Sequence, residues 1–384
     1  MSLSRKQESE LLKRGFSRRH FGRVATLMGA GAASLPFFGE HALAQLSQVR
    51  GMPADAVKIN ANENPLGPCQ EAMDAIHTVA KMGGRYTYEL TDEFRETLAA
   101  QSESGVMPNA VQPYPGSSAP LHQTVLGFCS PTKSFVTADP GYEAGERAAK
   151  FIGAKVVKVK LNPKTYAHDV KAMAAADPNA GVLYLCNPNN PTGTLTSKED
   201  IEWLAKNKPK GSILLLDEAY THISGAPLMT HLVAQGEDVI ILRTFSKIYG
   251  MAGIRAGAAI GKPELLEKIT PWSAGALPIT GMAAATASLK SKDVVPVRRK
   301  IIGDVRTDVF AFMDKHNFEY VPSVSNKFMA NVHKPGDEVI QALRKEKIYI
   351  GRVWSSWPTH VRVSIGTQEE MDKFKTAFLK VMSA

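Results

Sequence analysis

Four side chains that can take part in catalysis lie between residues 217 and 255. Asp217 and Tyr220 end one apolar run, Lys247 follows a second, and Arg255 comes eight residues after the lysine (255 − 247). In an open α/β sheet, ligands bind beyond the carboxyl ends of the strands, so we expect these residues to meet there. An acid, a phenol, a lysine and an arginine at one edge of a sheet indicate a site for one anionic, ring-containing cofactor.

Three further segments are expected near the same edge. Gly116, Ser117 and Ser118 form a small, hydroxyl-rich turn before an apolar helical pattern at 121–128. This turn is a candidate anion site, because N–H groups at a helix start bind anions and hydroxyl groups add donors. Tyr142 follows a turn that could present its ring, and Asn190 lies in a proline-rich loop just beyond an apolar run at 182–186.

Strand and helix patterns alternate from about residue 110 to residue 260. This alternation predicts an α/β fold, with a mostly parallel central sheet and helices on both faces. After residue 272 a long basic helix near 294–315, short strands and a last helix near 369–382 indicate a second, smaller α+β domain. We predict four parts: a signal segment (1–44), an N-terminal arm with part of the small domain (45–80), a large cofactor-binding domain (81–272) and a small C-terminal domain (273–384).

The composition is that of an ordinary globular protein, with 44% hydrophobic residues in a chain of 384. Of the formal net charge of +9, the first 44 residues carry +4 from seven Lys/Arg and three acids, and the remaining +5 is spread without a basic block. A nucleic-acid partner requires a clustered basic face, so we predict none. Three cysteines without a C-x-x-C pair cannot form a complete disulfide framework, and we predict no metal site.

The first 44 residues have the features of an export signal. Arg18 and Arg19 lie in a twin-arginine pattern at residues 17–21. The apolar run at 24–38 is too short and too interrupted by glycine and proline to span a bilayer stably. Ala42-Leu43-Ala44 then forms a small-residue cleavage pattern. We therefore predict twin-arginine export to the periplasm and no stable membrane span. The alternative is a soluble N-terminal helix with a chance arginine pair.

Several motifs together resemble the pyridoxal-phosphate (PLP) aminotransferases of fold type I. These motifs are Asn187 to Gly193, Asp217 to Tyr220, and Thr244 to Lys247 with Arg255. Three more motifs narrow the resemblance to relatives of histidinol-phosphate aminotransferase: Asn62 to Gly67, Arg85-Tyr86, and Arg362 to Gly366. The similarity runs from about residue 58 to the C-terminus and implies a large PLP-binding domain with a smaller domain beside it.

The resemblance implies roles for the residues around the cofactor. Lys247 would hold PLP as an imine and then move a proton as general acid/base. Asp217 would keep the ring nitrogen protonated, so that the ring can draw electrons from the substrate. Tyr220 and Asn190 would hydrogen-bond the phenolic oxygen of the ring, and Tyr142 would stack on its face. The implied phosphate binders are Gly116, Ser117, Ser118, Thr244, Ser246 and Arg255.

The resemblance also implies the substrate contacts and the assembly. Arg362 would bind the anionic group of the substrate, with Arg352 and Asn64 as further candidate contacts. Tyr86 would reach the phosphate of the neighbouring subunit's cofactor, which implies a homodimer with shared active sites. The implied reaction moves an amino group between an amino acid or amine, histidinol-phosphate-like or otherwise anionic, and a 2-oxo acid.

Two alternatives remain open at this point. The same scaffold can support a PLP-dependent decarboxylase, lyase or racemase, because the bond that breaks depends on how the substrate is held. The second alternative is a non-catalytic binder or regulator. An intact Lys247, a complete set of phosphate binders and no fused DNA-binding region argue against it.

Overall fold

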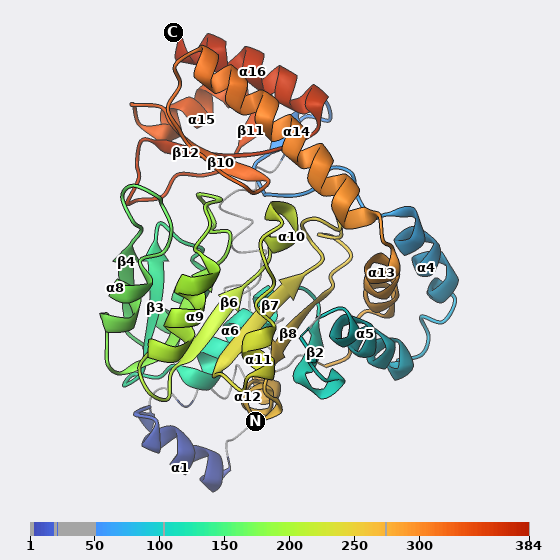
Figure 1. Ribbon diagram of the computed structural model, residues 1–384, viewed down its shortest axis with the longest axis vertical. Coiled ribbons are helices and arrows are strands. Elements are labelled where there is room, and N and C mark those ends of the chain that lie inside the picture. Colours follow the sequence, from blue (N-terminus) through green and yellow to red (C-terminus); the bar gives the residue numbers. More distant parts are fainter. Residues whose placement is uncertain (1–3, 19–20, 22–50, 103, 273–274, 384) are drawn as a thin grey trace.

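A seven-stranded sheet forms the centre of this computed structural model, which describes residues 4–18, 21, 51–102, 104–272 and 275–383 (Figure 1). The strand order is β2-β8-β7-β6-β5-β3-β4. Within this sheet β8 is antiparallel to both of its neighbours, and the other pairs are parallel, which confirms the predicted mostly parallel sheet. The strand bounds are β2 Val111–Tyr114, β3 Ser134–Asp139, β4 Val156–Lys160, β5 Ala180–Cys186, β6 Ile213–Asp217, β7 Val239–Thr244 and β8 Gly257–Gly261.

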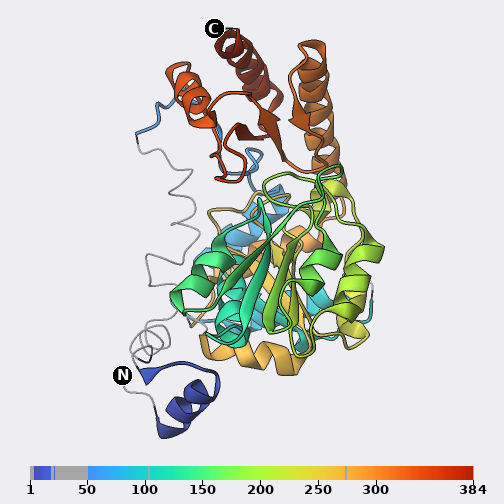
Figure 2. The same cartoon turned by 90° about the vertical axis from the view of Figure 1, so that its left-hand side faces the viewer.

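The central strands are mostly apolar, and helices cover both faces of the sheet (Figure 2). Every residue of β5, β6 and β7 is buried, as is typical of parallel strands packed on both sides. The polar residues that follow β6 and β7 are therefore delivered to one edge. The covering elements are α6 Ser118–Phe128, α7 Ala144–Phe151, α8 Val170–Ala175, α9 Lys198–Asn207, α10 Thr221–Ser224, α11 His231–Ala234, α12 Pro263–Ile269 and the 3-10 turns η1 Pro108–Ala110 and η2 Thr270–Trp272.

A smaller α+β unit lies at one end of the molecule (Figure 1). Its antiparallel sheet has the order β12-β10-β9, and β1 of the N-terminal arm pairs in parallel with β11. The arm therefore contributes a strand to this unit. The bounds are β1 Val57–Ile59, β9 Tyr320–Val321, β10 Lys327–Asn331, β11 Ile348–Ile350, β12 His360–Ser364, α14 Val294–Lys315, α15 Gly336–Lys345 and α16 Gln368–Met382.

Three helices pack together beside β2. Helix α13 (Ile279–Lys290) contacts α4 (Gln70–Ala80) and α5 (Tyr88–Ala100), and α5 also contacts β2. Helix α13 comes after residue 272, where the small domain is predicted to begin. It nevertheless packs against α4 and α5, so it does not belong to a separate unit that begins at residue 273. The four-part division of the chain stays a prediction.

The N-terminal segment contains one described helix, α1 (Arg5–Lys13), capped by Ser4. Arg14 follows it and donates hydrogen bonds to the carbonyl oxygens of Leu126 and Cys129 at 2.7 and 2.9 Å, next to the buried ring of Phe16. Arg19, the apolar run and the predicted cleavage site lie outside the described residues. Within the described ranges, no helix is both long enough and apolar enough to cross a bilayer.

Candidate active site

Asp217, the last residue of β6, is a buried carboxylate held by two hydrogen bonds. The Tyr184 hydroxyl donates to its Oδ2 at 2.9 Å, and the Ala219 N–H donates to its Oδ1 at 3.1 Å. Burial raises the pKa of Asp217 to about 6, against these two hydrogen bonds and the charges of Lys247 and Lys327, which lower it. A carboxylate in this position can stabilise a cation placed against it, such as a protonated ring nitrogen.

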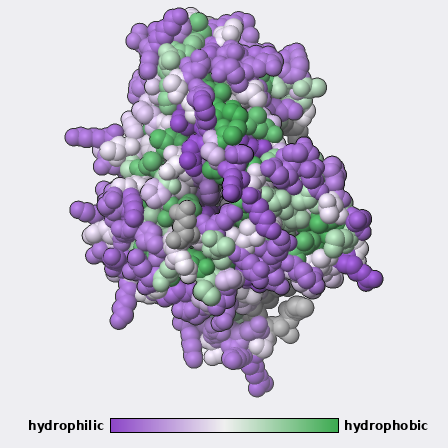
Figure 3. Space-filling model, turned by 45° about the vertical axis from the view of Figure 1, so that its right-hand side comes forward, coloured by the Kyte–Doolittle hydropathy of each residue, from purple (hydrophilic) through white to green (hydrophobic). Residues whose placement is uncertain are grey.

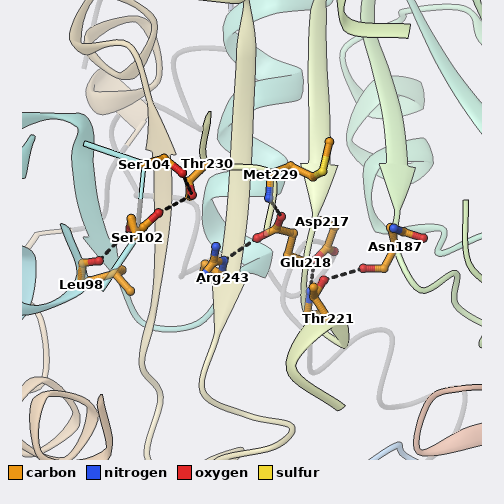
Figure 4. A network of polar contacts seen from close by, with 11 residues as sticks. Leu98, Ser102, Ser104, Asn187, Asp217, Glu218, Thr221, Met229, Thr230 and Arg243 are labelled. Atoms are coloured by element: carbon orange, nitrogen blue, oxygen red, sulfur yellow. Dashed lines mark hydrogen bonds and ion pairs between the residues drawn. The ribbon is translucent and has the colours of Figure 1, made fainter. Parts of the chain in front are cut away.

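The segment after Asp217 is fixed by a buried polar network (Figure 4). Glu218 accepts a hydrogen bond from the Met229 N–H at 2.8 Å and forms an ion pair with Arg243 of β7 at 2.6 Å. Thr221 donates to the carbonyl oxygen of Asn187 at 2.8 Å. The network ties the ends of β5, β6 and β7 together, so Asp217 and Tyr220 stand on a rigid support.

Tyr220 lies where the two units of the molecule meet. Its hydroxyl accepts a hydrogen bond from the Asn62 side chain at 3.2 Å. Burial raises the pKa of this hydroxyl above its ordinary value, so Tyr220 remains a proton donor. The ammonium group of Lys247 lies 5.9 Å from the centre of the Tyr220 ring, and its charge also acts on Asp217. Lysine, acid and phenol are therefore neighbours, as the sequence predicts.

The predicted phosphate binders lie around the guanidinium group of Arg255. This group donates to Ser246 Oγ at 3.4 Å and to the Pro115 carbonyl oxygen at 3.0 Å. Thr244 donates to Ser246 at 3.0 Å, and Ser117 makes no side-chain capping hydrogen bond at the start of α6. Gly116 has a φ of 98°, and a Cβ atom at this position would meet the guanidinium group of Arg255, so glycine suits both the backbone and the close approach. We call this group, Gly116, Ser117, Thr244, Ser246 and Arg255, the phosphate cup. It has the hydrogen-bond donors that a dianion requires.

Arg362 of β12 reaches across to Asn190. Its Nη1 donates to Asn190 Oδ1 at 3.2 Å, and its Nη2 donates to the carbonyl oxygen of Asn60 at 2.7 Å. Its Nε is buried and has no hydrogen-bond partner. Burial lowers the pKa of Arg362 to about 10, which still leaves it charged at neutral pH. The predicted substrate arginine is thus a buried cation with an unused donor.

The other predicted contacts are placed differently. Arg352 forms an ion pair with Glu143 at 2.5 Å, and its guanidinium lies 4.1 Å from the centre of the Trp354 ring. The Asn64 side chain donates to the Ile248 carbonyl oxygen at 3.0 Å and accepts from the Leu66 N–H at 3.1 Å. Both residues are already engaged within the protein, and their contact with substrate stays a prediction. Tyr142 is partly buried near Arg362 and Tyr184, and Tyr86 is 69% exposed.

Three site residues have no predicted role in the sequence analysis. Tyr184 resembles any buried strand residue, and nothing in its neighbours indicates that it holds Asp217. Asn62 lies in a motif that the sequence singles out, but its bond to Tyr220 joins residues far apart in the chain. Lys327 is fully buried, with its ammonium nitrogen 3.0 Å from the centre of the Tyr220 ring. Of the three, only Lys327 could have been noticed from the sequence, because a charged lysine is unusual at the start of a strand.

Comparison with known proteins gives consistent results. A family model described as aminotransferase class I and II matches residues 54–378. The chain belongs to this family. It is 32% identical over 334 residues to the histidinol-phosphate aminotransferase of Symbiobacterium thermophilum, covering 84% of this chain and 90% of that protein. It is 31% identical over 343 residues to the aromatic amino acid aminotransferase of Cutibacterium acnes, covering 85% and 95%.

A solved structure supports the same assignment for this class I/II aminotransferase. The histidinol-phosphate aminotransferase of Sinorhizobium meliloti, in complex with pyridoxal-5′-phosphate, has a TM-score of 0.77 and 25% identity. The match covers 85% of this chain and 90% of that one. The protein is therefore a PLP-dependent transaminase with the predicted fold type I. Its residues fit the cofactor: the cup at Arg255 suits the phosphate, and Lys247 and the buried acid Asp217 suit the rest of the ring.

The burial of Asp217 predicts a pH-dependent effect of Asp217→Asn on the cofactor-free protein. The folded carboxyl holds its proton more tightly than the unfolded one, so its contribution to stability is lost as pH rises from the ordinary pKa of 3.8 through about 6. The two pKa values convert to a penalty of about 3 kcal/mol at pH 8 and little at pH 4. Asp217→Asn should therefore raise the melting temperature at pH 8 more than near pH 4.

Differential scanning calorimetry of the cofactor-free protein measures this effect. Glu267→Gln, which removes an exposed acid on α12, is the matched control and should behave alike at both pH values. An Asp217→Asn variant that is destabilised equally at both pH values would contradict the electrostatic interpretation.

Proposed function

We propose that this aminotransferase moves an amino group between a donor with an anionic group, histidinol-phosphate-like, and a 2-oxo acid. The observation that carries the proposal is Arg362, a buried guanidinium whose Nε has no partner and which forms no ion pair with a carboxylate of the described residues. A buried charge that lacks a counter-charge is costly, so a substrate anion would complete the site. The relatives named for histidinol phosphate support this substrate class.

The side chains divide the chemical work. Bound PLP supplies an electron-withdrawing ring that stabilises negative charge on the reacting carbon. Asp217 keeps a proton on the ring nitrogen, and Tyr220 and Asn190 provide hydrogen-bonding groups for the ring oxygen. The amine of Lys247 binds the cofactor and later carries a proton as general acid/base. Arg362 orients the substrate through its anionic group, and the burial of the site keeps water from the reacting atoms.

Lys247→Ala should remove both the covalent attachment of the cofactor and the proton carrier. Turnover with any amino donor should fall below detection, and the absorbance band of the bound cofactor should no longer respond to donor. The measurement is absorbance of the purified protein before and after a donor and a 2-oxo acid are added. Lys210→Ala, at an exposed lysine, is the control and should retain full activity. Turnover retained by Lys247→Ala would refute the assigned role.

We also propose a homodimer with shared active sites. Exposed hydrophobic side chains gather on the face that carries α4, α5 and the start of α14 (Figure 3). Tyr86 is among them and stacks on Tyr88, with ring centres 6.1 Å apart. A second copy covering this face would bury these side chains and bring Tyr86 to the neighbouring cofactor. The exposed residues are Leu66, Met82, Tyr86, Tyr88, Val297 and Ile301.

Charged residues on this face should separate the subunits. In Val297→Asp/Ile301→Asp, the burial of two carboxylates would oppose association, so the variant should sediment as a monomer and lose most of its activity. Sedimentation velocity and the transamination rate of the same samples test the proposal. A wild-type protein that sediments as a fully active monomer would contradict it.

Export through the twin-arginine route is proposed on the sequence pattern of residues 17–44. Replacing Arg18 and Arg19 by lysine should keep the protein in the cytoplasm of its bacterial host, because the twin-arginine export machinery recognises the arginine pair. Fractionation of cells that produce the wild-type and the double-lysine chain is the measurement. Equal amounts of both chains in the periplasm would argue for a different signal.

A further inference from the structure

Lys327 is a buried cation that neither the fold nor the cofactor chemistry requires. It is the first residue of β10, and its side chain is fully buried. Its ammonium group donates to Ser325 Oγ at 2.9 Å and lies over the Tyr220 ring. Among the described residues, no carboxylate forms an ion pair with it. A buried lysine without a counter-charge costs stability, which a methionine or leucine at this position would not.

The strand register brings Lys327 next to the substrate arginine. In the antiparallel β10–β12 pair, Lys327 is opposite Ser364, and Met329 is opposite Arg362. Side chains of residues two apart on a strand point to the same face, so Lys327 and Arg362 are diagonal neighbours on that face. The charge of Arg362 acts directly on Lys327. The smaller unit therefore presents two cations, rather than one, to the place where the substrate's anion is expected.

The charges around the site leave these two cations unbalanced. Glu143 is paired with Arg352, and Asp217 faces the position of the cofactor ring nitrogen. Once the cofactor is bound, Lys327 and Arg362 have no acid of the described residues to balance them. One carboxylate of a substrate carries a single charge and would neutralise one of the two.

From this geometry we propose that Lys327 is a second anion-binding residue of the substrate site, and that with Arg362 it selects a group with two negative charges over a single carboxylate. The inference rests on the proposed function, because the anion is taken to be the substrate's. The doubly charged group can be one phosphoryl group or two carboxylates, and the ligands below distinguish these sources.

The surroundings of Lys327 suggest that binding is coupled to a proton. Burial lowers the pKa of Lys327 well below its ordinary value, and the charges of Arg362 and Lys247 lower it further. The charge of Asp217 acts in the opposite direction. A bound dianion would raise this pKa again, because a nearby negative charge favours the ammonium form, so dianion binding should be accompanied by proton uptake.

Three ligands that share a benzyl group test the selectivity on the cofactor-loaded protein. Phenylacetate carries one negative charge, whereas benzylphosphonate and benzylmalonate carry two at pH 8. Isothermal titration calorimetry should show at least one dianion binding more tightly than phenylacetate by roughly tenfold or more, as expected of one charge-assisted hydrogen bond. In Lys327→Met this preference should fall to about twofold or less, a near-complete loss of that bond.

Two further readouts separate this role from a structural one. Titration in two buffers with different ionisation enthalpies should show proton uptake on dianion binding in the wild type and less uptake in Lys327→Met. The melting temperature of Lys327→Met should rise, because methionine fills the space without a buried charge. Lys345→Met, an exposed lysine on α15, is the control and should change neither the selectivity nor the proton uptake.

The outcomes are distinguishable. A lower melting temperature of Lys327→Met with unchanged selectivity would make Lys327 a structural lysine and overturn the proposal. Equal affinity of the wild type for all three ligands would also overturn it. Dianion binding through Lys327 in a protein that transfers no amino group would refute the proposed function and leave the two-cation site standing.

Discussion

The burial of one carboxylate, Asp217, is the constraint on which the site depends. A charged carboxylate inside a protein is costly unless it is hydrogen-bonded and faces a positive charge. The structure supplies the hydrogen bonds through Tyr184 and the Ala219 N–H. The positive charge proposed for this place is the protonated ring nitrogen of the bound cofactor, which would explain why a strand of otherwise apolar residues ends in an acid. The free energy that burial of the carboxylate costs in the cofactor-free protein would then favour cofactor binding.

The large unit carries Asp217, Lys247 and Arg255, whereas the smaller unit carries Arg362 and Lys327, the cations proposed to bind substrate. The N-terminal arm connects the two units. The Asn62 side chain donates a hydrogen bond to Tyr220 and accepts one from Ser364 of β12. The backbone carbonyl oxygen of Asn62 accepts a hydrogen bond from Asn326. Asn60 accepts from Arg362. Asn60 and Asn62, two residues apart in the arm, therefore tie Tyr220 on the large unit to Arg362 and Ser364 on β12. The parallel pairing of β1 with β11 fixes the arm to the smaller unit and so holds these backbone positions in place.

The sequence predicts the fold well because its main signals are local. Apolar runs that end in Asp217 and precede Lys247 indicate parallel strands, and the Gly116 turn indicates a helix start that binds anions. The start of α5 is less local: this helix begins at Tyr88, after Thr87 with a positive φ of 39°. A left-handed backbone at threonine is unusual and cannot be read from composition. Family motifs bring together the lysine, the acid, the phenol and the arginines, and the structure places these residues around one site.

The residues that sequence reasoning misses act through long-range pairing. The bond from Tyr184 to Asp217 requires the register of β5 and β6, in which Cys186 is opposite Asp217. Lys327 becomes a neighbour of Arg362 only through the register of β10 and β12. Neither register can be derived from local patterns, because a shift by one residue would turn each side chain to the other face.

Asn190 links the two halves of the chemistry. Its Oδ1 accepts from Arg362, and the other end of the same amide is the donor assigned to the ring oxygen of the cofactor. If Asn190 donates to the ring oxygen as proposed, an anion that draws on Arg362 would act on the same amide that orients the ring. Because the amide is planar, neither contact could turn without the other, so substrate binding would be coupled to the hydrogen bonding of the cofactor.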